Sequence, residues 1–237
     1  AHAQTATWDG DVGGNWNTGG NWLLNTVPSA GDVLTFGEPV NLVTTNDISD
    51  GFLVGGMTFT NGFPGEDFTL DGLGITLNGD IDCILNNTAA QGTNVVIENA
   101  INLDIDVDGD RNIYARQNTP GSGSNEYHRI RINGSISGDR LIKEGEGMVT
   151  LAGANDNAGF DSNNGTLAIA HADALGATNR LKNTTAELQI NNGVTVNAPL
   201  TVGNTGNNKI LKLESGTTNV GEYAGTITLE ETGQWNL

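Results

Sequence analysis

The chain has 237 residues, of which 34 are glycine, and its 28 acidic against 10 basic side chains give a formal net charge of −18. This excess of negative charge argues against nucleic acid and anionic membrane surfaces as partners, because both are bound through clustered lysine and arginine. Only 16% of the residues are charged, which is typical of a folded chain rather than a disordered one.

The first four residues, Ala1-His2-Ala3-Gln4, resemble the small-residue end of a secretory signal that has been removed. No apolar run in the sequence approaches the roughly 20 residues that a membrane helix needs. We therefore expect a secreted protein or a protein of the extracellular surface, with its signal peptide removed and with no transmembrane segment.

Residues 1–31 form a segment that is rich in tryptophan. Three of the four tryptophans of the chain lie in it, namely Trp8, Trp16 and Trp22. The end of a solenoid exposes apolar side chains that must be covered, and large indole rings suit this task. We therefore predict an N-terminal cap, or a segment that is exchanged with a neighbouring copy. The alternative is that these three tryptophans and Trp235 contact another subunit or provide stacking platforms for sugars.

A short phrase of alternating β-forming residues, followed by a glycine or asparagine turn, returns throughout residues 32–237. It is clearest at residues 33–36, 56–62, 68–72, 74–79, 147–153, 187–193 and 225–230. Alternation with a period of two buries one face of a strand, and a phrase repeated along a chain is typical of a solenoid. We predict an all-β fold, a single domain similar to a parallel β-helix, with a Gly/Ser-rich loop at residues 116–127. A β-sandwich or jelly roll is the alternative fold, since regularly spaced short strands suit both.

The chain has one cysteine, Cys83, which therefore forms no internal disulfide. Strand alternation places it on the same face as Ile81 and Leu85. We predict that Cys83 is a small buried side chain rather than a reactive thiol.

Four aspartates stand at alternate positions, namely Asp104, Asp106, Asp108 and Asp110, and Gly109 lies between the last two. Carboxylates at this spacing, followed by glycine, are typical of a calcium loop. The closing glutamate is missing, because Ala115 stands at the twelfth position. Two hypotheses remain open here, a calcium site that relieves the repulsion between like charges, and an outward acidic strand face without metal.

The most concentrated basic patch is the run from Tyr127 to Arg131, which contains His128 and Arg129. Polysaccharide lyases place such residues beside acidic sugars, and we keep a lyase centred on His128 and Arg129 as a less favoured hypothesis. The simpler interpretation is an outward strand face whose arginines pair with acidic neighbours. On this interpretation the protein is not an enzyme.

Residues 141–155 and 164–167 resemble the autotransporter-associated β-strand repeat of bacterial secreted and surface proteins. The matching positions in the first run are Leu141, Lys143, Gly145, Gly147, Val149, Leu151, Gly153 and Asn155. The resemblance implies a parallel β-helix that is secreted or anchored at the cell surface, and it implies no catalytic residues. We expect no C-terminal translocator barrel, because no series of membrane strands follows these repeats.

Asparagines recur in or beside the predicted turns, at Asn78, Asn133, Asn164 and Asn192. In a solenoid such residues can stack in ladders of side-chain hydrogen bonds. The alternative is that surface turns merely tolerate asparagine.

The function that these features favour is that of an extracellular structural protein, a filament or a surface or matrix subunit that assembles head to tail with copies of itself. Solenoid ends are sheet edges with unpaired backbone groups, and a head-to-tail contact that does not close extends into a fibre. The alternative is a carbohydrate-binding or adhesive module with polysaccharide as its partner. Calcium is the only cofactor that the sequence suggests.

Overall fold

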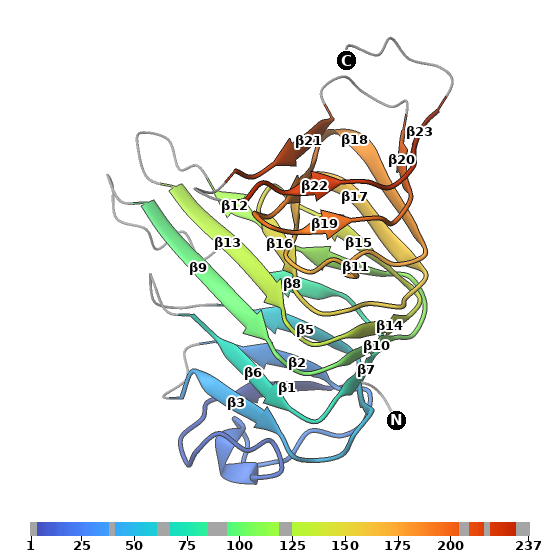
Figure 1. Cartoon of the computed structure of the whole chain (residues 1–237). Helices are drawn as coiled ribbons and strands as arrows, with labels where there is room; N and C mark the ends of the chain where they lie inside the picture. Colours follow the sequence, from blue (N-terminus) through green and yellow to red (C-terminus); the bar gives the residue numbers. More distant parts are fainter. Residues whose placement is uncertain are drawn as a thin grey trace.

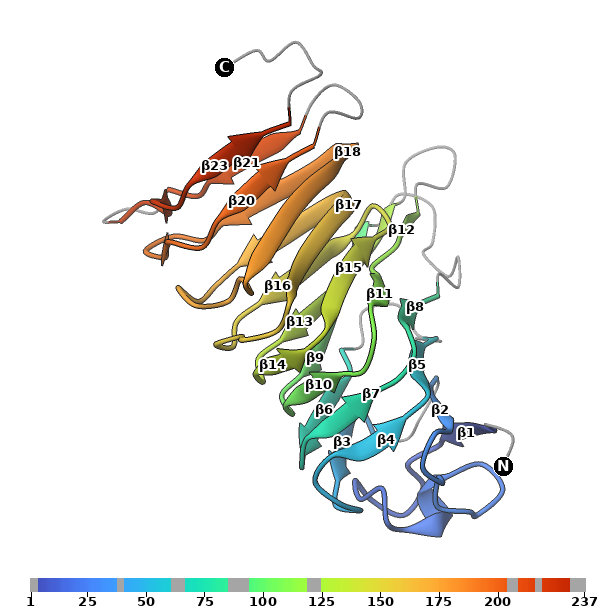
Figure 2. The ribbon, with the colours of Figure 1, turned by 90° about the vertical axis from the view of Figure 1, so that its right-hand side faces the viewer.

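The structure, a computed structural model, describes residues 4–37, 41–60, 67–84, 94–118, 125–203, 209–215 and 219–230. The chain winds into a solenoid whose turns, or rungs, stack in sequence order from the N-terminal to the C-terminal end (Figures 1 and 2). Strands on one face of successive rungs pair in parallel. The predicted all-β solenoid is therefore confirmed, and the alternative of a sandwich, whose strands pair antiparallel, is not the fold that forms.

Each rung places strands on up to three faces. The first face consists of β1 (Thr5–Trp8), β2 (Val33–Phe36), β5 (Gly56–Phe59), β8 (Ile81–Cys83), β11 (Arg111–Tyr114), β15 (Arg140–Glu144), the first halves of β17 (Gly159–Ile169) and β18 (Thr178–Ile190), β20 (Leu200–Val202) and β23 (Ile227–Leu229). The second face consists of β3 (Val43–Asn46), β6 (Thr69–Gly72), β9 (Asn94–Ile101), β13 (Asn125–Ile132), β16 (Met148–Leu151), the second halves of β17 and β18, and β21 (Ile210–Leu213). The third face consists of β4 (Phe52–Val54), β7 (Ile75–Leu77), β10 (Ile105–Val107), β14 (Ile136–Gly138), β19 (Thr195–Val196) and β22 (Glu222–Tyr223). Because β17 and β18 cross two faces, 17 of the described strands belong to one sheet.

The rungs differ in length. On the first face Val33 pairs with Gly56, Arg111 pairs with Leu141, and Arg140 pairs with Gly159. The number of residues between partners is the length of one rung. It is largest between Arg111 and Leu141 and smallest between Arg140 and Gly159. Short β12 (Gln117–Asn118) pairs antiparallel with the start of β13. The predicted loop at 116–127 is therefore shorter than expected, and its residues 119–124 lie outside the described part of the chain.

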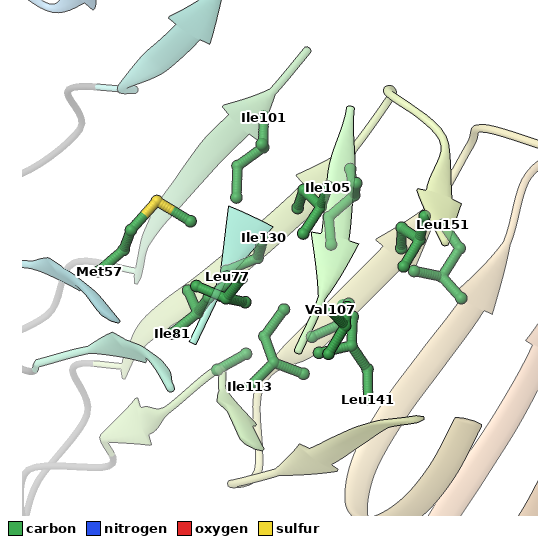
Figure 3. Close-up of a cluster of buried hydrophobic side chains, with 14 of the residues drawn as sticks. Met57, Leu77, Ile81, Ile101, Ile105, Val107, Ile113, Ile130, Leu141 and Leu151 are labelled. Carbon is green, nitrogen blue, oxygen red and sulfur yellow. The ribbon is translucent and has the colours of Figure 1, made fainter. Parts of the chain in front are cut away.

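Inward-pointing side chains of all three faces form one apolar core. On the third face Ile75, Ile105 and Ile136 lie in register on neighbouring strands, and each is at most 1% exposed. Figure 3 shows Val107 of the third face close to Ile113 and Leu141 of the first face. Full burial of such a side chain stabilises the fold by about 1.5–3 kcal/mol. Strand alternation, and so the sequence, determines which residues enter this core.

The single cysteine lies in this core, as predicted. Cys83 is fully buried beside Phe59, its neighbour in the ladder of β5 and β8. Burial away from water raises the pKa of the Cys83 thiol to about 12, and a hydrogen bond from Asn99 opposes the shift only in part. The thiol is therefore protonated and inaccessible in the folded protein.

The tryptophan-rich segment covers the first rung. Trp8, Trp16 and Trp22 are at most 2% exposed, and the ring centroids of Trp8 and Trp22 lie 5.1 Å apart in an edge-to-face arrangement. Trp16 extends the stack to Phe36, with 6.1 Å between the ring centroids. The same segment also covers the edge of β1, where the Leu23 amide donates to the Thr7 carbonyl at 2.8 Å. The N-terminal end is thus closed by aromatic packing and by backbone pairing.

A polar ladder runs along the outside of the solenoid between the second and third faces. The Asn133 side-chain amide donates to Asn102 Oδ1, and the Asn102 amide donates to Asp71 Oδ1, both at 2.6 Å. The three residues come from three successive rungs, so each bond joins one rung to the next. Asn133 therefore belongs to the kind of ladder that the sequence predicted.

Candidate functional site

The proposed lyase residues do not converge in the structure. His128 is fully buried, on the inward side of β13 with Ile130. Arg129 follows it directly and so points to the other side of the strand. A base that solvent cannot reach is unable to abstract a proton from a polysaccharide. The geometry therefore gives the lyase hypothesis no support, and the absence of enzymatic activity stays a prediction.

The acidic run at residues 104–110 is used in bonds between rungs. The Asp104 carboxylate accepts from the Ser135 amide at 2.7 Å, and Asp106 Oδ1 accepts from the Ser137 hydroxyl at 3.0 Å. Asp108 turns to the preceding rung, where its Oδ2 accepts from the Asn78 amide at 2.8 Å. Serine and asparagine donors thus relieve the repulsion that the sequence suggested a cation would relieve.

No group of three or more histidine, cysteine, aspartate or glutamate side chains that could hold a metal occurs among the residues that the structure describes. Asp110 is the fourth member of the predicted calcium set and follows Gly109 on the exposed side of the turn. The calcium site at Asp104, Asp106, Asp108 and Asp110 stays a prediction, and the outward acidic strand is the interpretation that these hydrogen bonds favour.

The buried tryptophans do not form a sugar platform. The indole N–H of Trp8 donates to the Asn41 carbonyl at 3.1 Å, and that of Trp22 donates to the Trp16 carbonyl at 2.8 Å. Trp16 donates to the Thr44 hydroxyl. Rings that are covered on their faces and satisfied at their polar atoms leave no surface for a sugar to stack on. Trp235, the remaining candidate, lies outside the described residues.

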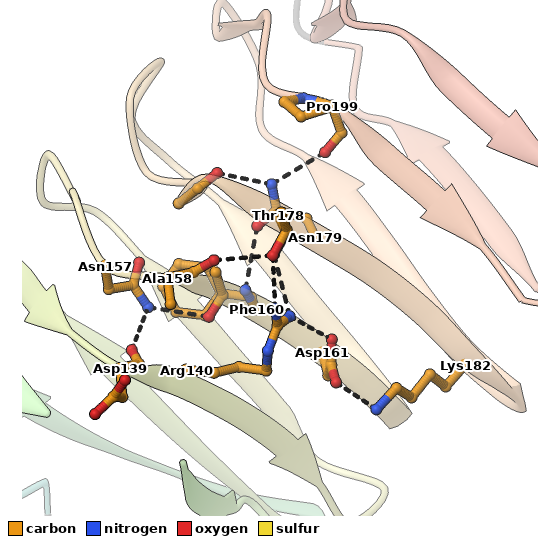
Figure 4. A network of polar contacts seen from close by, with 12 residues as sticks. Asp139, Arg140, Asn157, Ala158, Phe160, Asp161, Thr178, Asn179, Lys182 and Pro199 are labelled. Carbon is orange, nitrogen blue, oxygen red and sulfur yellow. Dashed lines mark hydrogen bonds and ion pairs between the residues drawn. The ribbon is translucent and has the colours of Figure 1, made fainter. Parts of the chain in front are cut away.

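A charged network that the sequence analysis missed joins three rungs (Figure 4). The Asp161 side chain is 4% exposed, and its two oxygens pair with Arg140, at 2.7 Å, and with Lys182. The three residues follow one another at equal intervals, from position 140 to 161 and from 161 to 182. This equal spacing, close to the length of one rung, is the signal that could have revealed the network. Its geometry is that of a clamp between rungs, because each group has its partner within the protein.

Lys143 is a buried lysine that joins one rung of the solenoid to the next. Its side chain is 1% exposed, and Nζ donates to the carbonyl oxygens of Glu144, Gly145 and Asn164 at 2.6–2.9 Å. The three acceptors match the three N–H bonds of an ammonium group. Burial lowers the pKa of Lys143 to about 7, and the charge of Glu144 opposes this shift in part. The lysine of the repeat-like motif thus ties the turn after β15 to the following rung.

Exposed apolar side chains gather at the two ends of the solenoid. Of the residues that the structure describes, 11 large hydrophobic ones are exposed. Five belong to the last rung, namely Ile210, Leu211, Leu213, Val220 and Ile227, and three belong to the N-terminal cap, namely Val12, Leu23 and Leu24. Val43 lies on the first full rung, and, of these exposed residues in the described part of the chain, only Leu73 and Ile84 lie between Val43 and the last rung. This distribution differs from the scattered single exposures of an ordinary soluble surface.

Leu24 is the most exposed of these residues, at 87%. Its φ is 133°, in a region that side-chain-bearing residues avoid. Such a conformation costs on the order of 1–3 kcal/mol and is found mainly where a functional surface requires it. The turn is fixed by a hydrogen bond from the Asn25 amide to the Trp22 carbonyl at 2.7 Å. The cap therefore holds an apolar side chain out into solvent at an energetic cost.

The C-terminal end, in contrast, is an open edge in the described part of the chain. β21 pairs with β18, β22 with β19, and β23 with β20, each on one side only. Among the described residues, the amide and carbonyl groups on the other side have no neighbouring strand, and such an edge can accept a further strand. The two ends thus differ in the part of the chain that the structure describes, because one is capped and the other presents apolar side chains beside an open sheet edge.

Comparison with models of known protein families, with curated proteins and with solved structures finds no match. The resemblance to the autotransporter-associated repeat rests on the motif alone and stays a prediction. No helix in the described residues is long and apolar enough to cross a membrane.

Proposed function

We propose that the protein is an extracellular structural protein that assembles head to tail with copies of itself into a filament or a surface or matrix layer. The observation that supports this function best is the gathering of exposed apolar side chains at both ends of the solenoid. An end-to-end contact buries these side chains from water, which is favourable by about 25 cal/mol per Å² of apolar surface.

The difference between the two ends makes the contact heterologous. A capped end that meets an open end leaves a capped and an open end free on the resulting pair, so that the assembly extends rather than closes. Leu24 projects from the capped end, and Val220, which is 58% exposed, belongs to the open end. These two residues are the contact residues that we propose.

Charge opposes this assembly and so provides a signature of it. Each chain carries a net charge of −18, and neighbouring copies repel one another. Salt screens this repulsion, with a Debye length of about 10 Å at 0.1 M ionic strength. Assembly that depends on apolar ends therefore increases with salt, whereas assembly held by ion pairs decreases. The extracellular location that we propose rests on the motif resemblance at residues 141–155 and 164–167.

The test compares Leu24→Asp and Val220→Asp with the matched control Leu73→Asp. Leu73 is also an exposed apolar residue, at 44%, but it lies on the side of the solenoid between β6 and β7. Sedimentation velocity at rising protein concentration measures the size distribution of each variant. We expect the two end variants to remain monomeric and Leu73→Asp to assemble like the unaltered protein. A monomeric unaltered protein, or equal assembly of all variants, would contradict the proposal.

A further inference from the structure

A groove lies at the N-terminal end of the solenoid, beside the outer edge of β1. Its walls are residues 4–7 of the strand region and the part of the cap that contains Leu23, Leu24, Val27 and Pro28. The hollow has a volume of about 140 Å³, close to that of cavities that hold a benzene molecule. It is therefore large enough to receive one apolar side chain.

The two walls of the groove are held together by Asp32. Its carboxylate accepts hydrogen bonds from the Gln4 amide at 2.9 Å and from the Ser29 amide at 2.8 Å. Gln4 directly precedes β1, and Ser29 belongs to the opposite wall. The groove is thus formed in the single chain, and a partner that enters it does not have to order it first.

The edge of β1 that faces this groove is open at Thr5. The Val33 amide donates to the Gln4 carbonyl at 2.8 Å, so the backbone groups of Gln4 face β2. Backbone groups alternate in direction along a strand, and those of Thr5 and Thr7 therefore face away from β2. Leu23 covers this edge at Thr7, whereas no strand among the described residues covers it at Thr5. The first half of the edge can therefore accept a strand.

The strand at the opposite end, β23, has an open edge of its own. The Leu200 amide donates to the Thr226 carbonyl at 2.9 Å, so the backbone groups of Thr226 face β20. By alternation those of Ile227 and Leu229 face away from β20. β23 follows β22 and begins a further rung, so in the described part of the chain it extends beyond the other two faces (Figures 1 and 2).

One unbroken ladder of register partners joins these two edges along the first face. Its members, in order, are Ala6, Leu34, Met57, Ile81, Ile113, Lys143, Ser162, Leu181, Val202 and Leu229. Ala6 and Leu229 are thus the two ends of the same ladder. A second copy that continued this ladder would place its Leu229 beside Ala6 and its Thr228 beside Thr5.

This placement also matches the directions of the backbone groups. Val33 donates to Gln4, the residue before its register partner Thr5. By the same pattern the Thr5 amide would donate to the Ile227 carbonyl of the second copy, and the Thr5 carbonyl would accept from the Leu229 amide. A shift by one residue would bring Thr5 opposite groups that face β20, and would turn the apolar side chains to the outside.

We infer that β23 of one copy adds to β1 of the next as a parallel strand, with Thr228 opposite Thr5 and with Leu229 in the groove. The inference rests on the proposed head-to-tail assembly and specifies its joint. The cap and the added strand are compatible, because the cap pairs with β1 at Thr7 and the added strand pairs at Thr5. Leu24, held out at an energetic cost, lines the groove that receives the strand.

A disulfide trap tests this register. Thr5→Cys and Thr228→Cys chains are mixed under conditions in which the unaltered protein assembles, and both threonines are exposed in the single chain. Neighbouring strands lie about 4.8 Å apart, within the Cα range of a disulfide. We expect mild oxidation to join one chain of each variant, with the bond between residues 5 and 228 identified by peptide mass mapping. The native Cys83 stays unreactive because it is buried.

The matched control uses Thr226→Cys in place of Thr228→Cys. Thr226 is also exposed and lies on the same side of the strand, about 7 Å along the chain direction. We expect the mixture with Thr5→Cys to lose the disulfide. Equal yields in the two mixtures would overturn the inference, because a joint without fixed register brings both positions together. Disulfides that form only between chains of one variant would also overturn it, since they would pair like ends.

Sedimentation velocity of the same mixtures before oxidation separates this inference from the proposed function. Assembly without a disulfide between residues 5 and 228 on oxidation would overturn the parallel joint and leave head-to-tail assembly standing. An unaltered protein that stays monomeric would contradict both.

A further variant tests the joint without cysteines. Thr5→Pro removes an amide that faces away from β2, and proline is tolerated at such an edge. We expect Thr5→Pro to keep the circular dichroism spectrum of the unaltered protein and to stay monomeric. The control Thr5→Ala keeps the amide, and we expect it to assemble. A folded Thr5→Pro protein that assembles as well as Thr5→Ala would overturn the inference.

Discussion

The buried lysine of the repeat-like motif makes stability depend on pH in an unusual direction. Lys143 has a pKa of about 7 in the folded protein, because burial disfavours the ammonium form, and the ordinary lysine value is 10.5. Between these two values the unfolded chain binds more protons than the folded one. The free energy of unfolding therefore rises with pH in this window, by up to about 1.4 kcal/mol per pH unit.

The perturbation that isolates this effect is Lys143→Met, which keeps an unbranched side chain in the core and removes the titrating group. Other groups titrate in the same way in both proteins and cancel in the difference. We expect the free energy of unfolding of the unaltered protein, minus that of Lys143→Met, to rise by about 1 kcal/mol from pH 7.5 to pH 8.5.

Urea unfolding followed by far-ultraviolet circular dichroism measures this difference at each pH. A difference that stays constant would show that the carbonyl cage of Glu144, Gly145 and Asn164 holds the ammonium with an unshifted pKa. A difference that falls with pH would show that the folded state favours the charged lysine. Either result would refute the statement that burial dominates at this position.

Three further predictions concern the packing between rungs. Gly159→Ala lowers the melting temperature by more than Gly31→Ala does. Both glycines have positive φ, but only a Cβ at residue 159 would overlap with a backbone carbonyl of the next rung. Equal losses of stability in the two variants would show that backbone strain alone decides. Cys83 does not react with a thiol reagent until urea unfolds the chain, since its pKa is raised to about 12 by burial; labelling of the folded protein would contradict this. Asp161→Asn lowers the free energy of unfolding in urea by about 3 kcal/mol, because two cations lose a buried partner. Asp82→Asn removes one partner of a more exposed pair and lowers it by about 1 kcal/mol or less. Similar losses in the two variants would show that burial of the pair has no effect.

The sequence predicted the features that depend on neighbouring residues. Alternation along one strand decides that Ile105 and Cys83 point inward, and both are buried. The clustering of tryptophans near the N-terminus predicts a cap, because large indole rings can cover the apolar side chains that the end of a solenoid exposes.

Features that depend on the register between rungs could not be predicted in the same way. Asp104 and Ser135 lie far apart in the sequence and become partners only because β10 and β14 pair in the register that joins Ile105 to Ile136. The length of a rung varies with its connections, so an acidic run resembles a calcium loop until its neighbours are known. The exposure of apolar residues in the last rung could not be predicted either. Leu211 has the same strand alternation as Leu188 and differs only in having no described strand beyond it.

Electron microscopy of the negatively stained protein, at physiological and higher salt, tests head-to-tail assembly most directly. The first face has ten described strands, so successive rungs about 4.8 Å apart give a solenoid roughly 45–50 Å long. We expect filaments with an axial repeat of this size, which become longer with salt and disappear in Leu24→Asp. Discrete particles of single chains under all conditions would contradict head-to-tail assembly.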